Sequence, residues 1–318
     1  MMIEQIEYGS AEGLLSALMP WAERKKMQGY IFRGVTKSEY PLLPSALRRE
    51  SFWQKAAAYR PAKPVEELHR LAQYAAEYHL IREFYKLANG CGLPVPLSPT
   101  LRQRLSRNYD FVAYQPTADE SYWLPNELLE GAALAQHYGI PTRLLDWSYD
   151  PFVALYFASQ VLDDNEGALA LWALHADNVY WEEVITPGIR LKFVTPHYSG
   201  NPNIAAQQGV FTHWPMHQVR FNGDVERAIE ELGRPIDRRP LDELLFEVYE
   251  EKLKGVIKKP ILYKMILPAA EAQVLREHLL RLGYGPSRIF PGYSGVAHQV
   301  LSVTSRSAAS KSNGASED

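Results

Sequence analysis

Cysteine is almost absent from this sequence, because Cys91 is the single cysteine in 318 residues. One thiol excludes an internal disulfide and a metal site built from several cysteines, so we expect a buried or inert Cys91 and the reducing cytoplasm as compartment. The first ten residues, MMIEQIEYGS, lack the basic start and apolar run of a signal peptide, and no stretch approaches the length of a membrane span. We therefore expect a cytoplasmic protein without a membrane partner.

A strong net charge and several familiar catalytic motifs are also missing. The 34 basic and 37 acidic residues leave a net charge of −3, which excludes a global attraction to nucleic acid and leaves open a local basic groove. The chain has no glycine-rich phosphate loop, no His and carboxylate spacing typical of zinc hydrolases, and no serine in a nucleophile elbow. We therefore expect no metal. What the sequence does contain is apolar and aromatic material, with 46% hydrophobic residues and 19 tyrosines, as in a globular protein.

The order of helix and strand patterns predicts an α+β fold, because few of them alternate strictly as strand, helix, strand. Apolar and aromatic runs predict strands at 29–34, 143–147, 167–175, 190–194, 261–267 and 297–303. Helical spacing is found at 10–26, where Ser10 is the expected cap, at 65–88, 101–108 and 128–138, and after Pro151 and Pro268. Residues 180–185 are expected to form a short helix or strand. The expected domain organisation is a helical lead-in at 1–28, a main domain at 29–303 with a helical insertion at 223–255, and a disordered tail at 304–318.

The stretch from Gly131 to Leu162 concentrates polar side chains between two helix patterns. Gly139 is a natural position for the first helix to end, and Pro151, with Asp150 as its cap, suits the start of the second. The polar residues between and beside these points are His137, Thr142, Arg143, Asp146 and Ser148.

Two interpretations of these residues stay open. Arg143 and Asp146 form either a buried ion pair that fixes the turn or part of a catalytic site. His137, whose ordinary pKa is near neutrality, is either a helix-terminal residue or a general base that Asp146 orients. Downstream, Gln207 and Gln208 interrupt an apolar run, so their amides need either hydrogen-bond partners in the core or a ligand.

Four ordered motifs carry a family resemblance. They are YIFRG at 30–34 with YPLLPSALR at 40–48, GAALAQHYGIPTRLLDWSYDPFVALYFA at 131–158, IAAQQGVFT at 204–212, and RIFPGYSG at 288–295. Together they resemble the FRG domain, over roughly 29–303. FRG-like chains are found in bacteria and phages, often as stand-alone proteins, so the resemblance implies a role in a defence or toxin system.

The order of these motifs also resembles the arginine, serine, glutamate order of ADP-ribosyltransferases, which implies a mixed, split β-sheet with flanking helices. The corresponding positions here are Arg33, Ser148 and Gln208. By this resemblance Arg33 contacts the phosphates or ribose of NAD, and Ser148 contacts the nicotinamide ribose. Gln208 is neutral where the resemblance expects a glutamate. The missing function would then fall to Asp146 and His137.

Two functions follow as expectations, and a third is a further possibility. The first is an NAD-dependent ADP-ribosyltransferase-like enzyme that acts on a nucleic-acid or protein acceptor in a bacterial toxin or anti-phage defence system. The alternative is a non-catalytic module that recognises a nucleotide or nucleic acid, and a nuclease acting through His137 is a third possibility without metal ligands to assist it. The expected catalytic residues are Asp146, His137 and Gln208. The expected NAD-binding residues are Arg33, Gly34, Thr142, Arg143, Ser148 and Gln207. Among them, Gly34 has no side chain and so permits close approach of the ligand.

Overall fold

A computed structural model describes residues 3–22, 27–60, 70–106, 122–160, 166–177, 179, 191–217, 234–253 and 260–302. The predicted tail at 304–318 lies outside these ranges, as do the expected element at 180–185 and the first part of the expected insertion, residues 223–233.

The centre of the fold is a mixed seven-stranded sheet with helices on both faces, which confirms the predicted α+β class. Its strand order is β1-β9-β5-β2-β4-β7-β6, in which β1 and β9 are parallel and every other pair is antiparallel. The strands are β1 (Ile3–Glu7), β2 (Tyr30–Val35), β4 (Leu144–Ser148), β5 (Ala168–His175), β6 (Lys192–Val194), β7 (Gly209–His213) and β9 (Leu262–Pro268). Two further strands, β3 (Tyr122–Trp123) and β8 (Met216–His217), form a separate pair.

The sheet nearly divides between β2 and β4. β2 pairs with β5 along its whole length, whereas its pairing with β4 consists of Phe32 opposite Ser148 alone. β4 pairs in turn along its whole length with β7. The sheet therefore consists of two well-paired halves that meet at a single residue pair.

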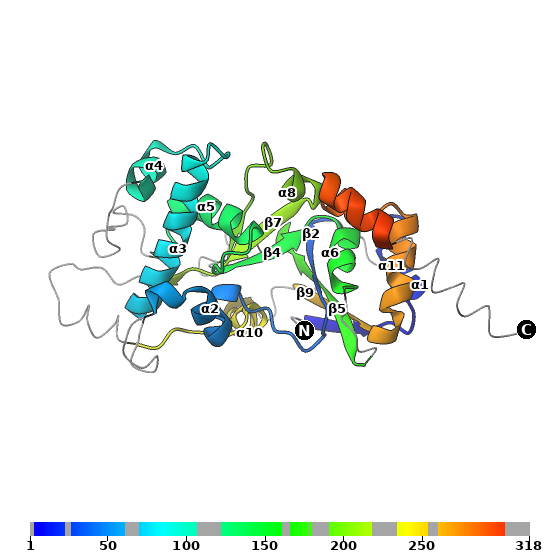
Figure 1. The fold of residues 1–318 in the computed structure, drawn as a ribbon. Coiled ribbons are helices and arrows are strands. Elements are labelled where there is room, and N and C mark those ends of the chain that lie inside the picture. Colours follow the sequence, from blue (N-terminus) through cyan, green and yellow to red (C-terminus); the bar gives the residue numbers. More distant parts are fainter. Residues whose placement is uncertain are drawn as a thin grey trace, which may run out of the picture.

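Two separate groups of helices cover one face of the sheet, one group for each half (Figure 1). Phe32 of β2 packs with the first group, and Ser148 of β4 lies opposite Phe32 and therefore on the same face of the sheet. Leu144 shares this face of β4 with Ser148 and packs with the second group. The first group is α1 (Ala11–Leu18), α6 (Pro151–Ala158) and α11 (Ala272–Arg281), and the second is α3 (Arg70–Gly90), α4 (Pro99–Ser106) and α5 (Asn126–His137).

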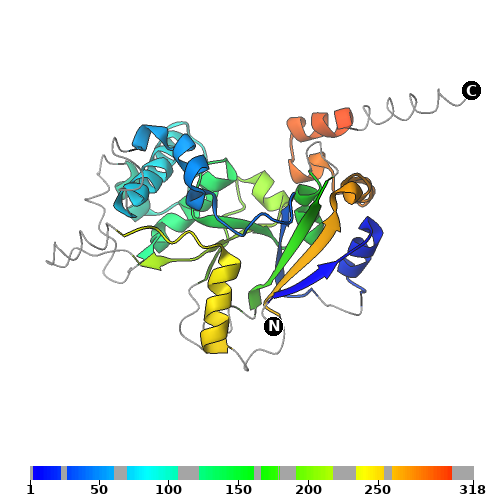
Figure 2. The ribbon, with the colours of Figure 1, turned by 90° about the horizontal axis from the view of Figure 1, so that it is seen from below.

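The opposite face of the sheet is covered by α10 (Leu241–Val248), drawn in yellow in Figure 2. Leu241 and Leu245 of this helix pack against Leu145, Trp147 and Trp172 of the sheet. α10 lies in the segment expected to be a helical insertion, and it forms part of the core. The shorter helical elements are η1 (Ser45–Leu47), α2 (Arg49–Lys55), η2 (Ala57–Tyr59), α8 (Pro202–Ala206), the π-helical turn η5 (Tyr249–Leu253), η6 (Ala269–Glu271) and α12 (Pro286–Ile289).

Local capping signals in the sequence are confirmed. The Ser10 side chain accepts a hydrogen bond from the Gly13 backbone N–H at the start of α1, 3.2 Å away. The Asp150 carboxylate does the same for Phe152 at the start of α6, at 2.9 Å. Gly139, with φ +89°, follows the end of α5.

Two predicted elements differ from the structure. The strand expected at 297–303 is wrong, because residues 293–302 are helical. Val296 and Val300 recur four residues apart, a spacing that fits a helix better than the alternation of a strand. The opening helix expected at 10–26 ends at Leu18, two residues before Pro20, and the strand β1 ahead of it was not expected.

Gly34 is required by the packing of α6 on β2. A Cβ atom added at Gly34 would lie 1.9 Å from the backbone oxygen of Ala154 and 2.9 Å from the Cβ of Ala158. This glycine therefore permits the close approach of a helix to β2.

We expect Gly34→Ala to lower the free energy of unfolding by about 2 kcal/mol or more, because a backbone atom cannot move away from the added methyl group without displacing α6. Gly131→Ala is the matched control. It lies inside α5, an added Cβ would meet nothing within 4 Å, and we expect it to stabilise the protein by about 0.5–1 kcal/mol. Urea unfolding of both variants measures the difference. Equal stability of the two variants would show that α6 does not depend on Gly34.

Candidate functional site

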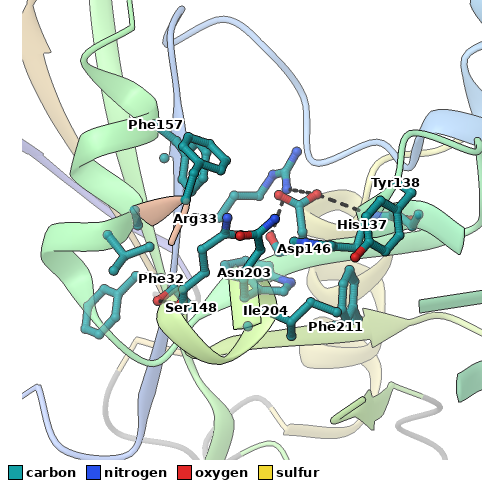
Figure 3. Close-up of a pocket in the computed structure, with 18 residues that line it drawn as sticks. Phe32, Arg33, His137, Tyr138, Asp146, Ser148, Phe157, Asn203, Ile204 and Phe211 are labelled. Carbon is teal, nitrogen blue, oxygen red and sulfur yellow. Dashed lines mark hydrogen bonds and ion pairs between the residues drawn. The ribbon is translucent and has the colours of Figure 1, made fainter. Parts of the chain in front are cut away.

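A cavity of about 360 Å³ opens where β2 and β4 diverge, between α6 of one helix group and α5 of the other (Figure 3). It is lined by Phe32, Arg33, Gly34, Gln136, His137, Tyr138, Asp146, Trp147, Ser148, Val153, Ala154, Phe157, Asn203, Ile204, Gln207, Gly209, Phe211 and Phe290. This volume suits a small organic ligand or a nucleotide.

The cavity has an apolar end and a polar end. Phe157 and Phe290 meet edge to face at the apolar end, with ring centroids 6.1 Å apart. In Figure 3, Phe157 and Phe32 lie on one side and His137 on the other, with Arg33, Asp146 and Asn203 between them. The arrangement fits a ligand with a planar ring at one end and charged or hydroxyl groups at the other.

An ion pair between Arg33 and Asp146 spans the gap between β2 and β4. The Arg33 Nη1 lies 2.6 Å from the Asp146 Oδ1, and it also donates a 2.8 Å hydrogen bond to the Asp146 backbone oxygen. Arg33 thus connects the strands beyond their last backbone pair. Its side chain is 14% exposed, whereas that of Asp146 is 64% exposed, so the carboxylate is the partner that faces the cavity.

Asp146 is held as a carboxylate. Burial by itself would raise the pKa of the Asp146 carboxyl. The charge and the hydrogen bond of Arg33 outweigh this effect, and the charge of Arg48 lowers the pKa further. The pKa of Asp146 therefore lies below its usual range. An ionised carboxylate open to the cavity can stabilise positive charge on a ligand.

A chain of hydrogen bonds fixes the orientation of Asp146. The Thr142 hydroxyl donates to the Gln136 side-chain oxygen, which leaves the Gln136 Nε2 to donate to the Asp146 Oδ1 at 3.3 Å. The Thr142 N–H in turn donates to the Ser45 Oγ at 3.1 Å. Thr142, expected to contact a ligand, instead lies behind the cavity wall and acts through Gln136.

His137 ends α5 and lines the polar end of the cavity. Burial lowers the pKa of His137, and the charge of Asp146 only partly opposes that shift. The imidazole is therefore neutral near pH 7 and has a nitrogen able to accept a proton. His137 is thus both a helix-terminal residue and a cavity residue.

Ser148 and Gln207 reach the cavity, and their polar groups also hold the protein together. The Ser148 Oγ donates to the Gln207 backbone oxygen at 2.7 Å and accepts from the Asp150 N–H at 2.9 Å. The Gln207 Nε2 donates to the Ile289 backbone oxygen at 3.2 Å. The Ser148–Gln207 bond thus ties the end of β4 to the segment before β7, and the Gln207–Ile289 bond ties that segment to the end of α12.

Gln208 does not share the cavity with Arg33 and Ser148. It is exposed, has φ +47°, and is not one of the lining residues. The left-handed backbone conformation at the turn into β7 directs neighbouring side chains differently, and Gln207 is the glutamine that lines the cavity. Gln208, expected to be a catalytic residue, therefore does not lie in the cavity with Arg33 and Ser148.

Arg143 is a buried structural residue, and the ion pair expected between Arg143 and Asp146 is wrong. The Arg143 Nε lies 2.7 Å from the Glu77 Oε2, both side chains are at most 2% exposed, and the guanidinium stacks over the Tyr74 ring at 4.6 Å. Trp123 Nε1 donates to the same carboxylate oxygen at 2.6 Å. Side chains three positions apart on an extended chain point to opposite faces, which separates Arg143 from Asp146.

Several cavity residues were not expected from the sequence. Phe290 lies in the RIFPGYSG motif, so that motif was a usable signal. Gln136 precedes His137, but nothing in the sequence indicates its bond to Asp146. The remaining unexpected residues with polar or aromatic side chains are Phe32, Tyr138, Trp147, Phe157, Asn203 and Phe211.

Comparison with known families agrees with the motifs that surround the cavity. Residues 28–166 match the model of the FRG domain. The match supports the assignment of an FRG domain, and it includes Arg33, His137 and Asp146. The cavity residues Asn203, Gln207 and Phe290 lie beyond its end. No curated protein and no solved structure matches the chain.

The described ranges contain neither a metal-binding cluster nor a membrane-spanning helix. Within the described ranges, no three His, Cys, Asp or Glu side chains come together in a way that would hold a metal ion. None of the helices in the described part of the chain has the length and apolar character that a membrane span needs.

Glu77→Gln should destabilise the protein by about 3–5 kcal/mol, because it leaves the Arg143 cation buried without a countercharge. Asp146→Asn is the matched control in the cavity. Its ion pair is open to solvent, so we expect a loss below about 1 kcal/mol at pH 7. Chemical denaturation of the two variants compares the free energies of unfolding. A larger loss in Asp146→Asn than in Glu77→Gln would contradict the assignment of Arg143–Glu77 as the buried, structural pair.

The stability difference between the natural protein and Asp146→Asn should depend on pH. Because the folded protein lowers the pKa of Asp146, its carboxylate contributes stability that is present above about pH 4 and is lost as the pH falls through the folded value. Thermal melting of both proteins between pH 7 and pH 2.5 measures this difference. A constant gap over that interval would mean that Arg33 does not perturb Asp146.

Proposed function

We propose that the cavity binds NAD and that the protein transfers ADP-ribose from NAD to a nucleic-acid or protein acceptor. The observation that carries this proposal is the meeting of an ionised Asp146, a neutral His137 and the Arg33 guanidinium at one end of a cavity whose other end is aromatic. Such a cavity offers a carboxylate for the positive charge that grows on the ribose, a base for the proton of the acceptor, and a cation for the phosphates.

The placement of the motifs on the sheet supports the same proposal. The strands β2, β4 and β7 are neighbours, and Phe32, Ser148 and Gly209 stand opposite one another in a row across them. Arg33 is next to the first member of this row, and Gln207 and Gln208 precede the last. The three motifs that resemble those of ADP-ribosyltransferases therefore lie at one level of the sheet.

In the proposed reaction the bond between the ribose C1′ and the nicotinamide nitrogen breaks, and its electron pair leaves with nicotinamide. Positive charge then grows on the ribose, where the Asp146 carboxylate stabilises it. The acceptor forms the new bond to C1′ and gives its proton to the neutral His137 imidazole. Arg33 holds the phosphates, and the aromatic end holds a ring of the dinucleotide.

The position that the resemblance assigns to the catalytic glutamate is a neutral Gln208 outside the cavity. This favours a second candidate, a module that recognises a nucleotide without turning it over. In this case the Arg33–Asp146 pair would serve only to fix the ligand. The role in toxin or defence systems that FRG-like chains suggest is compatible with either candidate.

Nicotinamide release from NAD, followed by chromatography with water, single-stranded DNA, RNA or a polypeptide mixture as acceptor, tests the proposal. We expect release with at least one acceptor and a loss of about a hundredfold or more in Arg33→Ala and Asp146→Asn. Gln208→Ala, outside the cavity, is the control and should keep its activity. Binding of NAD by calorimetry without release would favour the recognition module, and the absence of both would refute both candidates.

A further inference from the structure

Among the residues that the structure describes, three side-chain amides line the cavity, and two of them are held by the protein. Gln136 accepts a hydrogen bond from the Thr142 hydroxyl and donates to the Asp146 carboxylate. The Gln207 Nε2 donates at 3.2 Å to the backbone oxygen at the end of α12. The third amide belongs to Asn203, and no protein group in the described ranges is hydrogen-bonded to it. Asn203 therefore offers both its donors and its acceptor to the cavity.

The backbone around Asn203 fixes the place of its side chain. Asn203 belongs to α8, which begins at Pro202, and its backbone oxygen accepts a 3.0 Å hydrogen bond from the Gln207 N–H. Residues four apart on a helical turn share a face, so Asn203 and Gln207 both reach the cavity. The next residue, Ile204, is buried against Gly209 at the start of β7. Asn203 thus stands on a short helix that is fixed to the sheet.

Asn203 is half-buried, which makes its unbonded amide informative. A polar group that is withdrawn from water costs free energy unless protein, ordered water or a ligand binds it. In Figure 3, Asn203 lies with Arg33 and Asp146 between the aromatic side of the cavity and His137. A ligand ring held at the aromatic end would therefore present its edge to the Asn203 amide.

We propose that Asn203 selects ligands by the edge of their ring, and that it takes a ring whose edge carries an N–H donor beside an acceptor. An amide has the complementary pair, an oxygen that accepts and an N–H that donates, in one plane. The adjacent amino group and ring nitrogen of adenine match this pair. A primary carboxamide on a pyridine ring matches it as well, because it also combines a carbonyl oxygen with an NH₂ group.

The charged groups of the cavity cannot make this distinction. Arg33 and Asp146 respond to the charge of a ligand, and a phosphate satisfies Arg33 whatever ring accompanies it. The neutral Asn203 amide instead rejects a ring that has lost its donor, because the amide oxygen then stays without a partner. The inference rests on the proposed function only in that NAD contains both kinds of ring.

Two pairs of neutral probes test Asn203, because the members of each pair differ by one substituent. Nicotinamide is paired with the corresponding pyridyl methyl ketone, in which a methyl group replaces the amide nitrogen, and adenosine is paired with purine riboside, which lacks the amino group. By NMR titration of the full chain, we expect the NH₂-bearing member of at least one pair to bind about tenfold more tightly. In Asn203→Ala this ratio should fall to within about twofold. The pair that responds identifies the ring that Asn203 contacts.

Gln208→Ala is the matched control, because it removes an amide from an exposed position outside the cavity. We expect it to keep the ratio of the unaltered protein. Asn203→Ala should also keep the melting temperature, since the Asn203 amide bonds to no protein group in the described ranges. Equal affinities within both pairs in the unaltered protein, a ratio that survives Asn203→Ala, or no binding of any probe would overturn the inference.

The outcomes for Asn203 and for the proposed reaction can be told apart. A ratio that depends on Asn203, without nicotinamide release from NAD, would support selection by Asn203 and refute the transfer reaction. Nicotinamide release by a protein that does not distinguish the members of either pair would support the reaction and overturn the selection.

Discussion

The end of the backbone pairing between β2 and β4 is the constraint on which the site depends. Past Phe32 and Ser148 the two halves of the sheet separate, and the helix groups above them separate as well. A gap in a sheet normally leaves backbone groups without partners. Here the Arg33 side chain donates to the Asp146 backbone oxygen and pairs with its carboxylate. One residue thus both bridges the gap and places a cation in the cavity.

Two arginine–carboxylate pairs in the same fold have opposite uses because of their surroundings. Arg143 and Glu77 are sealed in the core, with Trp123 and Tyr74 against them, so no ligand reaches them and their value is structural. Asp146 faces open space, where its charge is available to a ligand. Residue type alone does not separate these roles, since both pairs consist of an arginine and an acidic side chain at similar distances.

The sequence was a good guide wherever structure depends on near neighbours. The helix caps at Ser10 and Asp150 and the stop at Gly139 each involve residues at most a few positions apart. It failed where distant residues decide. Glu77 lies 66 positions before its partner Arg143, and nothing near Arg143 identifies it. The same holds for β1, whose pairing with β9 joins opposite ends of the chain.

The cavity and the sheet that carries it extend beyond the residues that match the FRG domain. β5 begins just after the matched stretch and pairs along the whole of β2, and β7 pairs along the whole of β4. The strands that carry Arg33 and Asp146 are thus each held by a strand from the later part of the chain. Phe290 and Gln207 also come from that part. Since later residues both position the ion pair and close the cavity around it, the candidate site depends on the complete sheet.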